Sequence, residues 1–283
     1  MTMTKPGPET GQKPDGEGAF VRIDWPDEDI ARLTLARGAA MNTLTWEMLG
    51  ALMNAFQDLR RDPPRALIVT GEGRAFCGGA HLKYFTEPDS DLADNPEGAR
   101  DPYVRQILNV FNALQDLPCP TIAAINGHAL GGGMEMAIAC DFRIISRTAR
   151  MGQPEVRLGL APGGNGIQQL IHLVGRPRAL DLILAGEAIE ADSALTFGLV
   201  SSVHEPDDLD AAALTFARRF LACGPRAVAI TKRAALRAEY AARSEADEIA
   251  LDAVFESFST DESREGIRAF VEKRRPRYDK LTK

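Results

Sequence analysis

The sequence predicts an α/β core followed by an all-helical C-terminal region. Between residues 19 and 206, short apolar runs typical of strands alternate with segments of helical periodicity. From about residue 207 the pattern changes to nearly continuous helix through residue 278, with periodic Ala, Leu and Phe, so we expect a C-terminal helical region at 207–283. No internal repeat of fixed period is present, and 283 residues suffice for a large core. We therefore expect a strand-and-helix core with a helical appendage.

The first predicted elements are two strands, a helix and a third strand. FVRID (20–24) and IARLTLA (30–36) predict a pair of strands joined by a polar turn. TWEMLGALMNAFQDLRRD (45–62) has apolar residues at helical spacing and ends in basic residues before two prolines. ALIVT (66–70) predicts a buried strand that stops at a glycine.

The middle of the chain continues the alternation. EPDSDLADNPEGARDP (87–102) is acidic and rich in helix breakers, so we expect a mobile surface loop. YVRQILNVFNALQDL (103–117) returns to helical periodicity. TIAAI (121–125) and DFRIIS (141–146) predict two further strands, separated by a glycine-rich turn.

The chain start and the overall charge restrict the class of protein. Residues 1–18 are polar and rich in Gly and Pro, which predicts a disordered leader and not a secretory signal. No run approaches the ~20 apolar residues of a membrane span. A net charge of −7 argues against a general nucleic-acid role. We expect a cytoplasmic protein with no membrane or nucleic-acid partner.

The cysteines, the histidines and the basic run near the C-terminus show little that points to a function. The four Cys and four His are dispersed, with no CxxC, HxxxH or HExxH spacing. This pattern predicts reduced thiols and no metal site. The basic run KRRPRYDK (273–280) is most simply a solvated helix end, and the alternative is a contact with a phosphate-bearing ligand.

Two glycine-rich turns follow predicted strands, GEGRAFCGGAHL (71–82) and NGHALGGGMEM (126–136). A helix start leaves backbone N–H groups unpaired, and glycines let a ligand approach them closely. Neither turn has the GxxxxGK[ST] or GxGxxG spacing of phosphate and dinucleotide sites. The better interpretation is an oxyanion hole built from both turns, and the alternative is two purely structural turns.

Two glutamates accompany these turns. Glu135 follows the three consecutive glycines, and Glu155 lies after Pro154 among mostly apolar residues. Buried carboxylates are rare unless they form ion pairs or take part in catalysis. Either residue alone is nevertheless compatible with a surface position. A helix and the following strand separate the two, so both side chains can reach one pocket. Carboxylates that share a site hold unequal protonation states, which suits acid–base catalysis.

Three stretches together resemble the crotonase (enoyl-CoA hydratase/isomerase) superfamily. They are VTGEGRAFCGGAHLK, AAINGHALGGGMEMAIACD and MGQPEVRLGLAPGGNG, and the resemblance runs from about Phe20 to the C-terminus. It implies an α/β spiral of β-β-α turns with a C-terminal α-helical trimerisation region. The implied assembly is a homotrimer or a homohexamer.

The resemblance also implies a catalytic site. The backbone N–H groups of Ala80 and Gly132 would bind the thioester oxygen of an acyl-CoA. Glu135 and Glu155 would hold and activate water, with Glu155 delivering the α-proton, and the N–H of Gly163 would help place that water. No metal or redox cofactor is implied, because CoA arrives as part of the substrate.

Further substrate-binding positions follow from the same resemblance. Gly78 lies in the first turn, and Arg74 and Lys83 match basic residues near the CoA phosphates. Lys273 would reach CoA from a neighbouring subunit. His81 departs from the family, because most relatives have Asp there; the change is either neutral or marks an altered substrate contact or reaction.

The paired glutamates favour one reaction over others of the superfamily. A 2-enoyl-CoA hydratase needs both, whereas a Δ3,Δ2-enoyl-CoA isomerase needs mainly one base. Hydrolases, decarboxylases and carbon–carbon lyases of the superfamily stay open, as does a non-catalytic acyl-CoA-binding scaffold. Both glutamates and both glycine turns are present, which counts against the scaffold.

Overall fold

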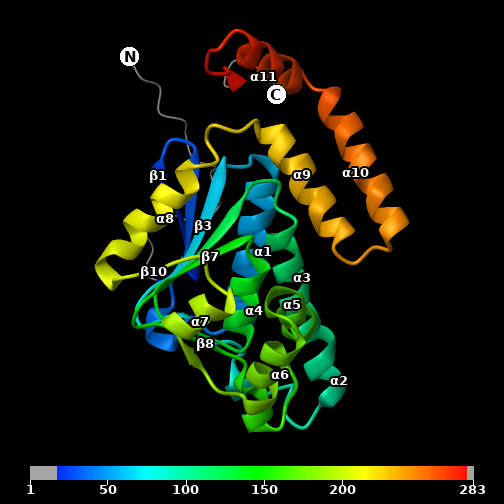
Figure 1. Ribbon diagram of the computed structural model, residues 1–283. Helices are drawn as coiled ribbons and strands as arrows, with labels where there is room; N and C mark the ends of the chain where they lie inside the picture. Colours follow the sequence, from blue (N-terminus) through cyan, green and yellow to red (C-terminus); the bar gives the residue numbers. More distant parts are fainter. Residues whose placement is uncertain (1–17, 279–283) are drawn as a thin grey trace.

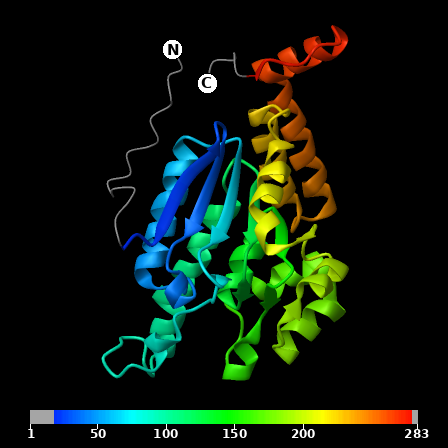
Figure 2. The same cartoon turned by 90° about the vertical axis from the view of Figure 1, so that its left-hand side faces the viewer.

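The computed structural model describes residues 18–278 (Figures 1 and 2). Apart from Gly18, the predicted leader therefore lies outside the described residues. The strands form a six-stranded and a four-stranded sheet. In spatial order, the first sheet contains β1 (Val21–Asp27), β2 (Ile30–Leu35), β3 (Ala66–Gly71), β5 (Thr121–Ile125), β7 (Phe142–Ser146) and β10 (Val203–His204). The second contains β4 (Ala75–Cys77), β6 (His128–Leu130), β8 (Arg150–Gly152) and β9 (Ile189–Glu190).

The helices lie between and around these sheets. The α-helices are α1 (Trp46–Arg61), α2 (Pro96–Gly98), α3 (Arg105–Gln115), α4 (Gly132–Ala139), α5 (Gly166–Val174), α6 (Arg176–Ala185), α7 (Ala191–Phe197), α8 (Leu209–Arg218), α9 (Pro225–Ala238), α10 (Arg243–Phe258) and α11 (Asp261–Val271). Shorter helical segments are η1 (Gly38–Ala40), η2 (Leu82–Phe85), the π-helical η3 (Ala99–Val104), η4 (Pro154–Leu158) and η5 (Pro206–Asp208). Within the described chain, no helix combines the length and apolarity needed to cross a membrane.

The chain alternates between the two sheets. β3, β5 and β7 each continue into a short strand of the second sheet, β4, β6 and β8 respectively. Neighbouring strands in both sets are parallel, whereas β1 and β2 form an antiparallel pair. This alternation is the predicted spiral of β-β-α turns. The five predicted strands match β1, β2, β3, β5 and β7. The predicted loop at 87–102 contains α2 and the first part of η3.

Both faces of the six-stranded sheet are covered by helices. Successive side chains of a strand point to opposite faces, so a strand such as β3 contributes residues to two core clusters. On one face, Leu33 and Val69 belong to a core cluster with residues of α1, α3 and α4. On the other, Ile68 and Ile122 cluster with Leu209 and further residues of α8. Burial on two faces explains why these strands read as continuous apolar runs.

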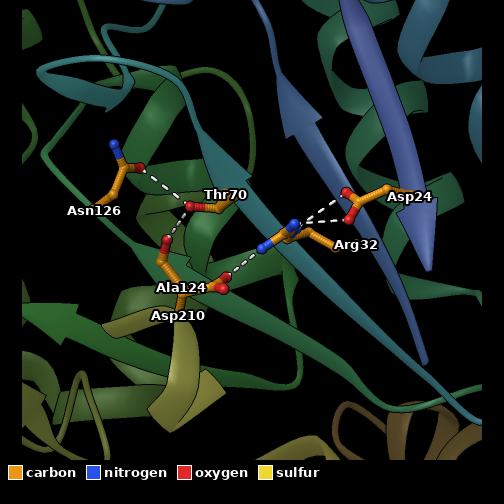
Figure 3. Close-up of polar contacts among 6 residues, drawn as sticks. All are labelled: Asp24, Arg32, Thr70, Ala124, Asn126 and Asp210. Atoms are coloured by element: carbon orange, nitrogen blue, oxygen red, sulfur yellow. Dashed lines mark hydrogen bonds and ion pairs between the residues drawn. The ribbon is translucent and has the colours of Figure 1, made fainter. Parts of the chain in front are cut away.

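An ion-pair cluster at the sheet edge anchors α8 to the strands. Figure 3 shows Arg32 of β2 between Asp24 of β1 and Asp210 of α8. The helix thereby belongs to the packing of the core, although it comes after the predicted boundary at residue 207.

The remaining C-terminal helices extend away from the sheets. α9 runs beside α10, and α11 follows at the end of the molecule (Figures 1 and 2). A nearly buried ion pair attaches α9 to the core: Lys232 Nζ lies 2.7 Å from Asp141 Oδ2 and donates to Cys119 O. As far as residue 278, the predicted helical region contains the four α-helices α8 to α11, the last of which ends at Val271.

Candidate active site

The first glycine turn connects β4 to η2. Gly79 has φ +86°, and a Cβ there would lie 2.6 Å from the carbonyl oxygen of Leu130, so only glycine fits. Its own carbonyl accepts a 2.9 Å hydrogen bond from the N–H of Leu44. The turn is therefore held between the second sheet and the segment before α1, with Ala80 next in sequence.

The second glycine turn connects β6 to α4. A Cβ on Gly133 would lie 1.9 Å from the carbonyl oxygen of Cys77. The first turn of α4 can therefore lie this close to β4 only because residue 133 is a glycine. A Cβ on Gly132 would lie 3.7 Å from the nitrogen of Ala80, which places the two turns side by side. Within residues 18–278, neither Ala80 N–H nor Gly132 N–H has a hydrogen-bond acceptor. Two free amides therefore sit together at a helix N-terminus, where negative charge is stabilised.

Asn126 ties the two turns together and was not singled out from the sequence. Its Oδ1 accepts a 2.9 Å hydrogen bond from Gly71 N and one from the Thr70 hydroxyl, and its Nδ2 donates to Gly73 O. Figure 3 shows Asn126 and Thr70 pointing toward each other, with the Thr70 hydroxyl also bound to Ala124 O. This side chain links the start of one turn to the start of the other.

Glu135 lies on the first turn of α4 and is only 3% exposed. Its Oε1 accepts hydrogen bonds from the N–H groups of Gly164 (2.8 Å) and Gly166 (2.9 Å). Burial raises the pKa of Glu135 to about 7, and repulsion from Glu155 adds to the rise, while the two N–H donors oppose it. This is a carboxyl that can hold or release a proton near neutral pH.

Glu155 lies on η4, and burial raises the pKa of this half-buried carboxyl as well. A Cβ on Gly131 would lie 2.8 Å from Glu155 Oε1, so the carboxyl rests against the start of α4. Gln153 is fully buried, and its amide nitrogen, when turned toward Glu155, donates to both carboxyl oxygens at 2.9 and 3.0 Å. Gln153 therefore orients Glu155 and was also missed from the sequence.

The structure brings four of the predicted residues into one site: Ala80, Gly132, Glu135 and Glu155. The third glycine cluster also contributes to the site. Within the described chain, the N–H groups of Gly164 and Gly166 bind Glu135. A Cβ on Gly163 would lie 2.7 Å from Val104, so this residue packs against η3, and its role in placing the water stays a prediction.

Three of the other predicted substrate-binding residues, Gly78, Arg74 and Lys83, lie around the first turn. The N–H of Gly78 donates to Met41 O at 2.8 Å, and Arg74 is exposed with its Nε 2.9 Å from Met41 Sδ. Lys83 is exposed on η2. Lys273 is exposed just after α11. Figure 1 shows α11 at the end of the helical tail, away from α4. The first three thus share the rim of one turn, and Lys273 does not join them within one protomer.

His81 follows Ala80 directly, and its ring is partly buried. Nδ1 lies 3.1 Å from the hydroxyl of Thr43, and the ring meets Tyr84 edge-on with centroids 4.8 Å apart. The imidazole is therefore engaged with neighbouring protein side chains. Among residues 18–278 no group of three or more His, Cys, Asp or Glu side chains is placed to hold a metal ion.

Comparisons with known proteins show the family to which the chain belongs. The family model for enoyl-CoA hydratase/isomerase matches residues 26–281. The chain belongs to the enoyl-CoA hydratase/isomerase family. This membership confirms the predicted superfamily and enzyme class.

Individual relatives cover nearly the whole chain. Crotonyl-CoA hydratase of Syntrophomonas wolfei is 37% identical over 254 residues, 89% of this chain and 95% of the relative. Short-chain-enoyl-CoA hydratase of Clostridium acetobutylicum is 37% identical, over 87% of this chain and 92% of its own. The crystal structure of an enoyl-CoA hydratase from Bacillus anthracis superimposes with a TM-score of 0.85 at 34% identity, covering 92% and 99% of the two chains. The crotonase fold of the family is therefore also the fold of this chain.

Proposed function

We propose that the protein is an enoyl-CoA hydratase, which adds water across the α,β double bond of a 2-enoyl-CoA thioester. The observation that carries the proposal is a pair of carboxyl groups, Glu135 and Glu155, that converge beside two unpaired amides and both have raised pKa values. Hydration requires an acid and a base on one substrate face together with stabilisation of the thioester oxygen.

In the proposed reaction the N–H groups of Ala80 and Gly132 bind the thioester oxygen. Glu135 accepts a proton from water as the water oxygen bonds to Cβ, and the electron pair of the double bond moves toward the thioester. Glu155 then gives its proton to Cα, which yields the 3-hydroxyacyl-CoA. Two nearby carboxyls that repel each other share one proton, so the pair supplies one acid and one base. Proton exchange between them through the next water restores the starting state.

We also propose how the substrate and the subunits are held. Arg74 and Lys83 bind the CoA phosphates at the rim of the first turn, and His81 and Gly78 line that rim. No resident cofactor takes part, since CoA is carried by the substrate. Lys273 reaches the CoA of a neighbouring subunit in a homotrimer or homohexamer. Large apolar side chains exposed on α10 and α11 support such an assembly; they are Leu251, Val254, Phe255, Phe258, Ile267, Phe270 and Val271.

The test is a panel of CoA thioesters followed by mass spectrometry. We expect crotonyl-CoA or a longer 2-enoyl-CoA to gain the mass of one water. Movement of a double bond without a mass change would favour the isomerase, and release of free CoA would favour a hydrolase. Fragmentation of the acyl chain would indicate a lyase. Binding of acyl-CoA without any turnover would favour a non-catalytic acyl-CoA-binding scaffold protein.

A further inference from the structure

Tyr103 is a fully buried tyrosine whose hydroxyl lies between two backbone groups near the first glycine turn. The hydroxyl accepts a 2.9 Å hydrogen bond from the N–H of His81. It donates a 2.6 Å hydrogen bond to the carbonyl oxygen of Leu44. Burial raises the pKa of Tyr103, so the phenol stays protonated and keeps its donor.

These bonds complete a short parallel pairing between Leu44 and Ala80. On one side of Ala80, the carbonyl of Gly79 accepts the N–H of Leu44 at 2.9 Å. In a regular parallel ladder the other side would be closed by a bond from His81 N–H to Leu44 O. The Tyr103 hydroxyl is inserted into that bond, accepting from one group and donating to the other.

This insertion clamps Ala80 from both sides while leaving its own N–H free. The peptide before Ala80 is held through Gly79 O, and the peptide after it is held through His81 N. A backbone amide stabilises a developing oxyanion only when it points at the position of that oxygen, and a shift of about 1 Å costs about 100-fold in rate. The orientation of the Ala80 N–H therefore depends on a hydroxyl that comes from η3, twenty-two residues after His81 in the chain.

We propose that Tyr103 is a positioning residue for the oxyanion-binding amide of Ala80. This inference rests on the proposed function, because it assumes that the Ala80 N–H binds a thioester oxygen. Without the hydroxyl, the His81 N–H and the Leu44 carbonyl each lose their buried partner. They either move together, which turns the Ala80 peptide, or remain unpaired.

The experiment compares Tyr103→Phe with the matched variant Tyr84→Phe. The Tyr84 ring lies 5.7 Å from that of Tyr103, but its hydroxyl accepts the N–H of Trp46 at 3.2 Å and does not touch the turn. Steady-state hydration of crotonyl-CoA gives kcat and KM. The infrared stretching frequency of the carbonyl-labelled saturated analogue butanoyl-CoA, measured on the enzyme, reports hydrogen bonding to the thioester oxygen.

We expect Tyr103→Phe to lower kcat by about 10-fold or more while KM changes less than about threefold. The bound carbonyl frequency should move back toward its value in free butanoyl-CoA. Tyr84→Phe should keep kcat within about threefold and leave the frequency unchanged. Tyr103→4-aminophenylalanine retains a donor and an acceptor and should recover part of both properties.

The outcomes separate this inference from the proposed function. The inference is overturned if wild-type protein hydrates crotonyl-CoA and the two Phe variants have equal kcat values and equal carbonyl frequencies. Reduced stability of Tyr103→Phe does not obscure the result, since only folded protein binds butanoyl-CoA. If wild-type protein turns over no enoyl-CoA, the proposed function fails, and the difference in carbonyl frequency still decides whether Tyr103 positions the amide.

Discussion

Helix α4 and the helix pair α10–α11 differ in which side chains they bury and which they expose. All eight residues of α4 are buried, including the charged Glu135, whose carboxyl is bound by backbone N–H groups. In α10 only Ile249 of sixteen residues is buried. Phe255 of α10 and Phe270 of α11 are 76% and 85% exposed. One region places polar groups inside the protein, and the other leaves apolar groups outside it.

This difference shows which groups find their partners within one protomer and which apolar surfaces one protomer leaves exposed. The buried Glu135 of α4 has its partners within the same chain, and those partners are backbone amides, which no side-chain substitution removes. The apolar faces of α10 and α11 have no such cover in the described protomer. Changes near α4 should therefore affect turnover, and changes in the tail should affect assembly.

The largest expected effect is on catalysis. Replacing Glu135 or Glu155 by Gln keeps the shape of the side chain and removes its ability to exchange a proton. Because acid–base catalysis is worth about 10²–10⁴-fold, each variant should lower kcat for crotonyl-CoA hydration by that factor. The sedimentation coefficient should stay that of the wild type. Hydration at the wild-type rate in either variant would contradict the two-carboxyl mechanism.

The second effect tests the attachment of the tail to the core. Lys232→Met leaves Asp141 without its cation in a site where the two side chains are 10% and 17% exposed. Loss of one partner of a buried pair should reduce the free energy of unfolding by about 3 kcal/mol, measured by urea unfolding at fixed protein concentration. The matched variant Arg61→Met breaks an exposed pair with Asp58 and should cost less than about 1 kcal/mol. Equal losses would show that the buried pair does not anchor α9.

The third effect is a pH dependence of stability. The pKa of Glu135 is raised by burial to about 7, above the value of 4.5 for the free side chain. Between these values the folded protein holds a proton that the unfolded chain has lost, so stability falls as pH rises, and the cost is complete above about pH 7. Glu135→Gln lacks this titration and should gain roughly 3 kcal/mol relative to wild type between pH 4 and pH 8. A pH-independent difference between the two urea-unfolding curves would place the Glu135 pKa near its ordinary value.

The fourth effect concerns assembly. Phe255→Ser and Phe270→Ser each remove an apolar side chain from the proposed subunit contact, a loss of roughly 2 kcal/mol per protomer. Analytical ultracentrifugation over a range of concentrations should show dissociation at higher protein concentration than for wild type. Turnover per protomer should change less than about threefold at concentrations where the assembly persists. Unchanged sedimentation of both variants would place the interface elsewhere.

The same contrast explains how much the sequence predicted. Strands β2, β3, β5 and β7 and helix α1 were found because burial leaves long runs or a helical period in the sequence. The glycine turns were found because their backbone geometry requires glycine. Glu135 and Glu155 were predicted as site residues because they are acidic residues in apolar surroundings.

The parts that the sequence did not predict depend on contacts distant in the chain. β4, β6 and β8 have three residues each, which is too short for a recognisable period. The donors to Glu135 come from residues about thirty positions later, and they are backbone groups that any residue carries. Asn126, Gln153 and Tyr103 have ordinary surroundings in the sequence, and their roles depend on which backbone groups the fold brings beside them.

The smallest effect is expected at His81, the residue that departs from the family pattern. The backbone of His81 holds the Ala80 peptide through Tyr103, and any residue supplies that N–H. The imidazole contributes a hydrogen bond with Thr43 and an edge contact with Tyr84, each worth about 1 kcal/mol. His81→Asp keeps a short acceptor for the Thr43 hydroxyl, so the unfolding free energy should fall by about 1 kcal/mol and kcat should change less than about threefold. A much larger loss of kcat, or a limb of the wild-type pH–rate profile that disappears in the variant, would instead show that the imidazole takes part in the reaction. That result would extend the proposed catalytic region from the carboxyls of α4 and η4 to the rim of the first glycine turn.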